Sequence, residues 1–247
     1  MKLSFWVYFF LFSVNQAAFG ASLSDLRVAI PAGLAPPLLM EKNGKMEGLI
    51  VDYTNAIAEK LGRKASYSVV TRYRLDGYLL SGKVDLLCYT SKIWDANRDF
   101  LEFSKTLFVK REIIVGPAPL PKKLNGFEGQ TIGTILQYVY PLLDPYFESG
   151  KMKREDNVSE EANLKKLLNG RIQYLVTDQI FLDYFRMLHP NISKNREAFS
   201  LQEYPILCSI GRQSSVKKKD LDKAVVELKA SGKMKSFFDK YGGTYIE

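Results

Sequence analysis

The stretch ASYSVVTRYRLDGYLLSGKVDLLCY, residues 65–89, decides the fold class. Residues 65–70 are predicted to form a strand, and residues 74–80 a helix that stops at Gly82. The apolar run 84–89 predicts a second, buried strand. Because the links between these elements are short, the strands are expected to form a parallel sheet with right-handed crossovers. The sequence thus predicts an α/β fold.

The same alternation of strands and helices continues on both sides of this stretch. A strand at 26–30 and a helix that opens at Gly48 and ends at Gly62 precede it. The elements predicted after it are strands at 111–115, 130–134, 174–177 and 206–210, and helices that start at Tyr138 or cover 160–168, 181–188 and 216–231. This pattern indicates two α/β units of similar design.

Residues 1–20 have the composition of a secretory signal peptide. Lys2 is followed by a roughly 12-residue apolar core, and the small residues Ala18 and Gly20 stand at −3 and −1 of a cleavage site. The alternative, a membrane anchor, needs about 20 apolar residues to span the hydrocarbon, and this run is shorter. We therefore expect an exported protein that is cleaved after Gly20.

Export changes the meaning of the basic composition. Lys and Arg number 35 against 27 Asp and Glu, which gives a formal net charge of +8. Removal of Lys2 leaves about +7, a positive field that favours anionic ligands or an anionic envelope surface. No nucleic-acid partner is expected, because an exported protein does not routinely meet nucleic acid.

Few residues suit metal, cofactor or covalent chemistry. Two cysteines and one histidine rule out a four-cysteine zinc site and most His-based triads. The chain has no P-loop, no G-x-S-x-G turn and no H-E-x-x-H motif. We therefore expect no metal, no cofactor and no enzymatic activity. Cys88 and Cys208 either form one bridge, closing a loop of about 120 residues, or stay as two buried thiols.

Four stretches, taken together, carry a family pattern. They are Gly48-x-x-x-Asp52 with Glu59-Lys60-Leu61-Gly62; Leu80-x-Gly82-Lys83-Val84-Asp85-Leu86 with Phe103-Ser104; Leu124-x-Gly126-x-x-Gly129-x-x-Ile132-Gly133 with Leu168-x-Gly170-Arg171-Ile172-x-Tyr174; and Gly232-Lys233-x-x-x-Phe237-x-x-Lys240-Tyr241-Gly242. Each is weakly specific alone. In this order and spacing they resemble the bacterial extracellular solute-binding proteins of family 3, the periplasmic amino-acid-binding type, over nearly the whole mature chain.

The resemblance implies a type II periplasmic-binding-protein fold, in which two lobes, each a mostly parallel sheet flanked by helices, close on a ligand by hinge bending. The implied boundaries are 21–107 plus 208–247 for lobe 1, 112–203 for lobe 2, and 108–111 and 204–207 for the hinge strands. It favours the disulfide, because Cys88 lies on a lobe 1 strand and Cys208 on the return strand expected beside it.

The resemblance also implies a role. Such a protein is a periplasmic monomer that binds a small-molecule ligand, an amino acid or related small acid. Its candidate partner is the membrane permease of an ABC transporter.

The expected ligand site lies outside the carboxyl ends of the strands, where helix N-termini offer unpaired N–H groups. Tyr89 and Trp94 offer rings for stacking, and Tyr138 would close the cleft from lobe 2. The full set of candidate ligand-binding residues is Tyr73, Arg74, Tyr89, Thr90, Ser91, Trp94, Arg98, Thr134, Tyr138 and Asp178.

Two positions depart from the family pattern. In the family, an Arg shortly before Phe-Ser holds the ligand carboxylate with its planar fork. A gap-free reading puts Asn97 there and Arg98 one residue late, so both stay candidates. Pro31 stands where a polar residue usually takes the ligand amino group, which puts an α-amino acid in question. Asp178 matches the second family carboxylate, or else caps a helix.

Two other functions stay open on this fold. A sensory protein would dock to a membrane receptor instead of a permease. A periplasmic dehydratase acting on prephenate-like acids would need a cleft carboxyl group with a shifted pKa, buried against apolar walls instead of paired.

Overall fold

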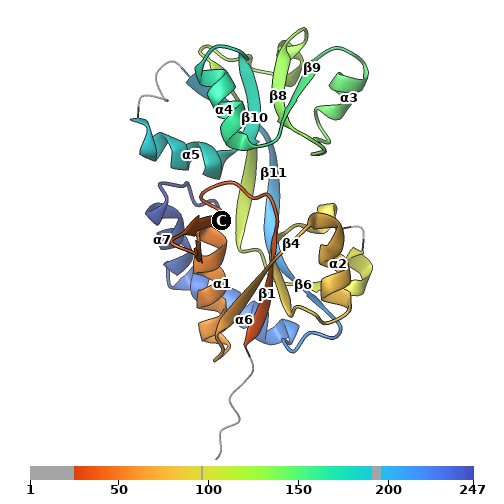
Figure 1. The fold of residues 1–247 in the computed structure, drawn as a ribbon, viewed down its shortest axis with the longest axis vertical. Coiled ribbons are helices and arrows are strands. Elements are labelled where there is room, and N and C mark those ends of the chain that lie inside the picture. The colour runs from red at the N-terminus through yellow and green to blue at the C-terminus, as the bar shows by residue number, and fades with distance from the viewer. Residues whose placement is uncertain (1–24, 96, 191–195) are drawn as a thin grey trace, which may run out of the picture.

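Two long strands, β7 (Phe108–Pro117) and β11 (Arg196–Gly211), run side by side along the length of the molecule (Figure 1). They pair antiparallel, with Lys110 opposite Tyr204. The computed structural model describes residues 25–95, 97–190 and 196–247, and further strands and helices surround each end of this pair. The chain therefore forms two halves, one above the other in Figure 1, which β7 and β11 connect.

The remaining elements belong to one half or the other. Those of the lower half are β1 (Leu26–Pro31), β2 (Met40–Lys42), β3 (Lys45–Glu47), α1 (Leu49–Lys60), β4 (Ala65–Val70), α2 (Arg72–Leu80), β5 (Leu86–Thr90), η1 (Lys92–Trp94), η2 (Arg98–Phe100), β6 (Leu101–Phe103), α6 (Lys218–Ala230) and α7 (Lys233–Lys240). Those of the upper half are η3 (Leu124–Phe127), β8 (Thr131–Ile135), α3 (Asp144–Glu148), β9 (Lys153–Asn157), α4 (Glu160–Leu168), β10 (Tyr174–Asp178) and α5 (Gln179–Leu188).

The strands follow the order β4-β1-β5-β11-β7-β10-β8-β9, and β6 pairs with β11. In the lower half β4 and β5 both pair with β1 in parallel, and in the upper half β8 pairs in parallel with β10 and β9. The α/β fold with parallel strands predicted from residues 65–89 is therefore confirmed. Apart from the separate β2–β3 pair, the antiparallel contacts all involve β7 or β11, which join the two parallel units.

Alternation along the strands divides the core between the two faces of each sheet. In β1, Val28 and Ile30 pack toward α1, α6 and α7, whereas Ala29 packs toward α2. In the upper half, Ile113 packs with α4 and α5, and Ile114 packs on the opposite face with η3 and β8. Because core side chains cover both faces of each sheet, the sequences of the central parallel strands are nearly continuous apolar runs.

The structure differs from the sequence prediction after β8. No helix starts at Tyr138, because Gln137 has a φ of 63°, which turns the chain away from a right-handed helix. The next helix, α3, starts only at Asp144. The strand β9 was not expected, because its sequence KREDN is polar, and it lies half-exposed at the edge of the sheet.

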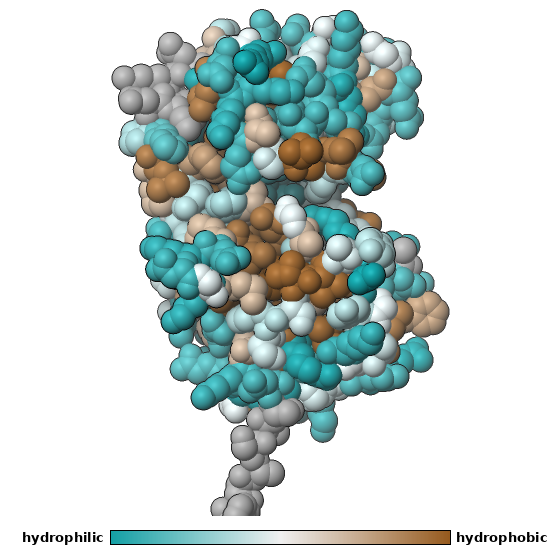
Figure 2. Space-filling view, viewed as in Figure 1, coloured by the Kyte–Doolittle hydropathy of each residue, from teal (hydrophilic) through white to brown (hydrophobic). Residues whose placement is uncertain are grey.

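The two halves also meet away from β7 and β11. The Tyr184 ring in α5 lies 6.4 Å from the Tyr241 ring, and Asp183 Oδ2 accepts a 2.9 Å hydrogen bond from Thr244 N. Elsewhere the surface is recessed between the halves, and hydrophobic side chains gather on the lower wall of this recess (Figure 2). The halves are thus in contact on one side and separated at the surface on another.

Two expectations concern membranes. Within residues 25–95, 97–190 and 196–247, no helix combines the length and the apolar character that a membrane crossing requires. The signal peptide expected at residues 1–20 lies outside the described residues.

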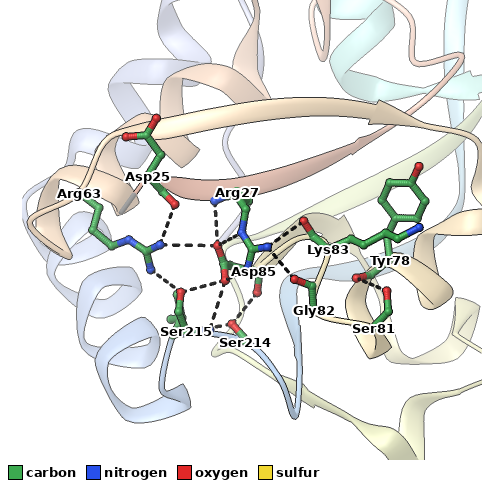
Figure 3. Close-up of polar contacts among 11 residues, drawn as sticks. Asp25, Arg27, Arg63, Tyr78, Ser81, Gly82, Lys83, Asp85, Ser214 and Ser215 are labelled. Atoms are coloured by element: carbon green, nitrogen blue, oxygen red, sulfur yellow. Dashed lines mark hydrogen bonds and ion pairs between the residues drawn. The ribbon is translucent and has the colours of Figure 1, made fainter. Parts of the chain in front are cut away.

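A buried carboxylate, Asp85, ties together four segments at the base of the lower half (Figure 3). Its Oδ1 lies 2.7 Å from Arg27 Nη2 and accepts a 2.8 Å hydrogen bond from Ser215 Oγ, and its Oδ2 lies 3.6 Å from Arg63 Nη2. Burial raises the pKa of Asp85, but the bonds from Arg27 and Ser215 outweigh it and hold the pKa well below its usual value. The carboxylate is therefore ionised and joins β1, β5, the end of α1 and the segment before α6.

We expect Asp85→Asn to lower the free energy of unfolding at pH 7 by about 3 kcal/mol, because the buried carboxylate loses its charged bonds with Arg27 and its bond with Ser215. A carboxylate whose pKa is depressed in the folded state stabilises above its unfolded pKa of about 3.9 and loses that contribution as the pH falls. The difference between the two proteins should therefore shrink below pH 4. Urea unfolding at several pH values measures it. The exposed Asp99→Asn is the control, and equal stabilities of Asp85→Asn and Asp99→Asn at pH 7 would contradict the prediction.

Cys88 in β5 and Cys208 in β11 are bonded to each other and lie opposite in register. The disulfide favoured by the sequence resemblance is thus present in the structure, and it joins residues 120 positions apart. Because the cross-link restricts the unfolded chain, it stabilises the fold more than a short-range bridge would in the chain-entropy model.

We expect the double variant Cys88→Ala/Cys208→Ala to unfold at a lower urea concentration, with a loss of up to about 4 kcal/mol because the unfolded chain regains the freedom that the bridge removes. When the wild-type protein is denatured without prior reduction, its cysteines should not react with a thiol reagent. Reaction of both cysteines before reduction would show that the bridge does not form.

Candidate functional site

One face of β7 changes from apolar to polar where the two halves meet. Phe108 packs in the lower core and Ile114 in the upper core. Between them, Lys110 and Glu112 are buried, although both carry ionisable side chains. These residues alternate, so they share one face of the strand. A buried polar stretch between two hydrophobic cores marks the position where a polar molecule can be held.

Lys110 stands at the centre of this stretch and is surrounded by aromatic rings. Its Nζ lies 5.5 Å from the ring centres of Trp94 and Tyr138 and 5.8 Å from that of Tyr204, and it donates a 3.3 Å hydrogen bond to Tyr138 Oη. The side chain is only 7% exposed. Burial disfavours the ammonium, but the phenol groups of Tyr89 and Tyr138 and the nearby carboxylates outweigh it and hold the pKa of Lys110 well above its usual value. Lys110 therefore stays charged at neutral pH.

Two carboxyl groups lie beside Lys110. Asp178 at the end of β10 is opposite Glu112 in β7, and both side chains are buried. Asp178 Oδ1 accepts a 2.7 Å hydrogen bond from Phe181 N and so caps α5. Burial raises the pKa of both carboxyl groups, against the opposing effect of Lys110. The site thus combines one cation with acids of reduced acidity.

Aromatic side chains from distant segments complete the group. The Trp94 ring lies 5.0 Å from Tyr204 and 6.4 Å from Tyr89, and Arg72 at the start of α2 lies 5.9 Å from the centre of the Tyr138 ring. Arg72 and Trp94 belong to the lower half, and Tyr138 to the upper half. The group therefore spans the junction between the halves.

The structure brings together four of the residues predicted from the sequence, namely Tyr89, Trp94, Tyr138 and Asp178, around Lys110. Of the two alternatives considered for Asp178, the structure shows the helix cap. Their role in ligand binding stays a prediction.

Three further candidates, Thr90, Ser91 and Thr134, are buried at or near the ends of β5 and β8. The Thr134 hydroxyl donates a 2.8 Å hydrogen bond to Asp156 and is used inside the upper half. The Ser91 hydroxyl is buried and has no hydrogen-bond partner among the described residues. Ser91 therefore keeps a free hydroxyl, three residues before Trp94.

The structure does not bring Tyr73, Arg74 and Arg98 to this group. Helix α2 is anchored by Leu75 and Leu79, one turn apart, and leaves Tyr73 80% exposed with Arg74 over its ring. Arg98 is exposed in η2. The role of these three residues at the ligand site stays a prediction.

The neighbouring candidate Asn97 is also used elsewhere. Its Nδ2 donates a 2.5 Å hydrogen bond to Asp76 Oδ2 in α2. Neither residue that could occupy the family Arg position therefore contacts the group around Lys110.

Lys110, Glu112 and Tyr204 were not predicted as site residues. They lie at or beside the expected hinge strands 108–111 and 204–207, which were assigned only a mechanical role. The signal was present, because a Lys and a Glu at alternate positions interrupt an apolar strand face.

Glu160 at the start of α4 is a further acid of the upper half, and the residue as a whole is half-buried. Its Oε2 is buried and has no hydrogen-bond partner among the described residues, and burial raises the pKa of Glu160 to about 8. Asp178 raises this pKa further, whereas Thr177 lowers it. Glu160 is therefore largely protonated at neutral pH. Among the described residues no group of three or more His, Cys, Asp or Glu is arranged to hold a metal ion.

We expect Glu160→Gln to raise the melting temperature at pH 8 and to leave it nearly unchanged at pH 4.5. A raised folded-state pKa means that the protonated form stabilises the fold below the unfolded pKa of 4.5, and that this contribution is lost as the pH rises toward 8. Gln mimics the protonated form at every pH. Thermal unfolding from pH 4.5 to 8.5 measures the effect, and a wild type that gains stability relative to Glu160→Gln at high pH would contradict it.

The comparisons with known proteins agree on one family. The family model "Bacterial extracellular solute-binding proteins, family 3" matches residues 26–244. The chain is 23% identical over 219 residues to the "Probable amino-acid-binding protein YxeM" of Bacillus subtilis (strain 168), covering 85% of this chain and 81% of that protein.

Two solved structures show the same fold. An ancestral arginine-binding protein bound to arginine aligns with a TM-score of 0.68 and 22% identity, over 90% of this chain and 100% of that one. The GluR0 ligand-binding core in complex with L-glutamate aligns with a TM-score of 0.70 and 15% identity, over 91% and 100%. The expected type II periplasmic-binding-protein fold is therefore confirmed.

Proposed function

The chain belongs to the bacterial extracellular solute-binding proteins of family 3, and we propose that it captures a small polar solute, an amino acid or a related small acid, between its two halves. The observation that carries this proposal is the group around Lys110. Trp94 of the lower half, Tyr138 of the upper half and Tyr204 of β11 all face one buried ammonium. A small molecule placed there would contact both halves at once.

The mechanism we propose is closure about β7 and β11. Lobe 1 would be 21–107 plus 208–247 and lobe 2 would be 112–203, with bending at 108–111 and 204–207. Support comes from β7 and β11, the strands that run through both halves (Figure 1). A ligand shifts such an equilibrium only by its difference in affinity between the open and closed states, so residues from both lobes must contact it.

We further propose that the protein acts as a periplasmic monomer and hands its solute to the membrane permease of an ABC transporter. The family is extracellular, which supports export. A sensory protein of this fold would bind its ligand in the same way and dock to a membrane receptor instead. The two roles differ in the partner and not in the ligand site.

We propose that the protein is not an enzyme. The relatives are solute-binding proteins, and binding in a closing cleft requires no reactive group. Glu160 is the one observation that favours a dehydratase, since its buried, partly unpaired carboxyl group has a raised pKa suited to general acid catalysis. Chemical analysis of the compound recovered from the protein distinguishes a binding protein, which leaves it unchanged, from a dehydratase, which converts it.

We expect a thermal-shift panel of amino acids, small mono- and dicarboxylic acids and polyamines to reveal at least one ligand of the purified mature protein. A ligand at 100 times its Kd adds about 2.7 kcal/mol, which raises the melting temperature by roughly 5–10 °C in a protein of this size. Mass spectrometry should recover the compound unchanged. A panel without any shift would contradict solute binding, and conversion of the compound would show catalysis.

The ligand identified by this panel also tests whether Arg98 contributes to binding, with the surface residue Lys218 as the control. Because Arg98 is exposed and away from the group around Lys110, we expect Arg98→Ala to change the Kd as little as Lys218→Ala does in calorimetry. A large loss of affinity for Arg98→Ala alone would restore the assignment made from the family pattern.

A further inference from the structure

We propose that the Lys110 ammonium anchors the anionic group of the ligand, so that the site selects solutes with a carboxylate and rejects cationic ones such as polyamines. This inference deepens the proposed function and rests on it. It moves the carboxylate anchor from the loop before β6, where the family pattern puts an Arg, to the strand β7 between the halves. The argument depends on the charge balance around Lys110.

The Lys110 ammonium is buried near Glu112 and Asp178, but within the described residues no carboxylate oxygen lies at ion-pair distance from it. It has three N–H donors, and the described residues provide one hydrogen bond, to Tyr138 Oη at 3.3 Å, and no ion pair. Burial of an ammonium is costly unless the charge is paired and its donors are satisfied. The ring faces of Trp94, Tyr138 and Tyr204 reduce that cost without using the donors. The donors are therefore available to an anion.

The neighbouring acids are less available than the ammonium. Asp178 Oδ1 already accepts the N–H of Phe181 at the N-terminus of α5, where the helix dipole also stabilises its charge. Glu112 lies opposite Asp178, and two carboxyl groups so close disfavour each other's ionised forms. Asp178 is thus engaged by the start of α5, whereas the Lys110 ammonium keeps N–H donors that an incoming ligand can use.

The surroundings of Lys110 suit an anion from both halves. Arg72 of α2 lies over the Tyr138 ring at 5.9 Å and adds a second positive charge from the lower half. The buried Ser91 hydroxyl, without a partner among the described residues, is a further donor near the end of β5. A carboxylate bound to Lys110 would therefore find additional donors on the lower wall.

A cationic ligand would have to displace the protein's own cation. The aromatic faces that could bind an ammonium or guanidinium are already turned toward Lys110 Nζ. A second cation in the same space would be repelled by Lys110 and Arg72. The site is thus complementary to acids and to zwitterions whose carboxylate reaches Lys110.

The test compares Lys110→Met with the wild type by calorimetry on L-glutamate, succinate, L-arginine and putrescine, together with whichever compound the panel identifies. We expect carboxylates without net positive charge to bind the wild type. Lys110→Met should weaken that binding by about 30-fold or more, because the ligand anion would be buried without its counter-charge. Lys110→Arg keeps the charge and should stay within about tenfold of the wild type. Lys218→Met is the surface control.

The outcomes separate this inference from the proposed function. Equal affinity of Lys110→Met and the wild type for the same compound overturns the anchor while solute binding stands. Tighter binding of putrescine or L-arginine to Lys110→Met would mean that the cage serves a ligand cation, which also overturns it. A wild type that binds none of the compounds overturns the proposed function itself. Circular dichroism confirms that each variant is folded, and Lys110→Gln replaces Lys110→Met if the latter is not.

Discussion

The structure depends on one constraint, which is that β7 and β11 pass from one hydrophobic core to another, and that β7 carries ionisable side chains on its inward face between the two cores. Along β7 the inward face runs from Phe108 through Lys110 and Glu112 to Ile114. The apolar ends fix the strand in both halves. The charged middle has to be satisfied by groups from whichever segments reach it, and these groups make up the candidate site.

The features that stabilise the lower half lie apart from this region. The Asp85 network is at the base of the half, at the starts of β1 and β5 (Figure 3), and the Cys88–Cys208 bridge lies within the sheet. In both features the groups bond to one another: Asp85 bonds to Arg27 and Ser215, and the two cysteine sulfurs form a disulfide. The group around Lys110 is open by comparison, with an ammonium and a Ser91 hydroxyl that keep unused donors among the described residues. This contrast is what distinguishes a structural cluster from a site of recognition.

Family membership and site chemistry need not change together. The family match covers residues 26–244, yet a gap-free reading puts Pro31 and Asn97 where the family pattern has polar and basic residues. In the structure, Asn97 bonds to α2 and Arg98 faces solvent. A fold specifies where a ligand is held, but the side chains at that position specify which ligand. At the proposed site of this chain, the distinctive group is an ammonium surrounded by aromatic rings.

Much of the architecture could be predicted from the sequence, because hydrophobic periodicity and glycine stops act locally. The strands near 65–70 and 84–89 and the helix at 160–168 were predicted close to their observed bounds. Tyr138 was placed at a helix start and was not found in one, since a single positive φ at Gln137 redirects the chain and no pattern reveals it. The site itself needed the tertiary structure. Only the pairing of β7 with β10 and β11 brings Lys110, Asp178 and Tyr204 together, and cross-strand register between residues so distant in the chain leaves no trace in local sequence.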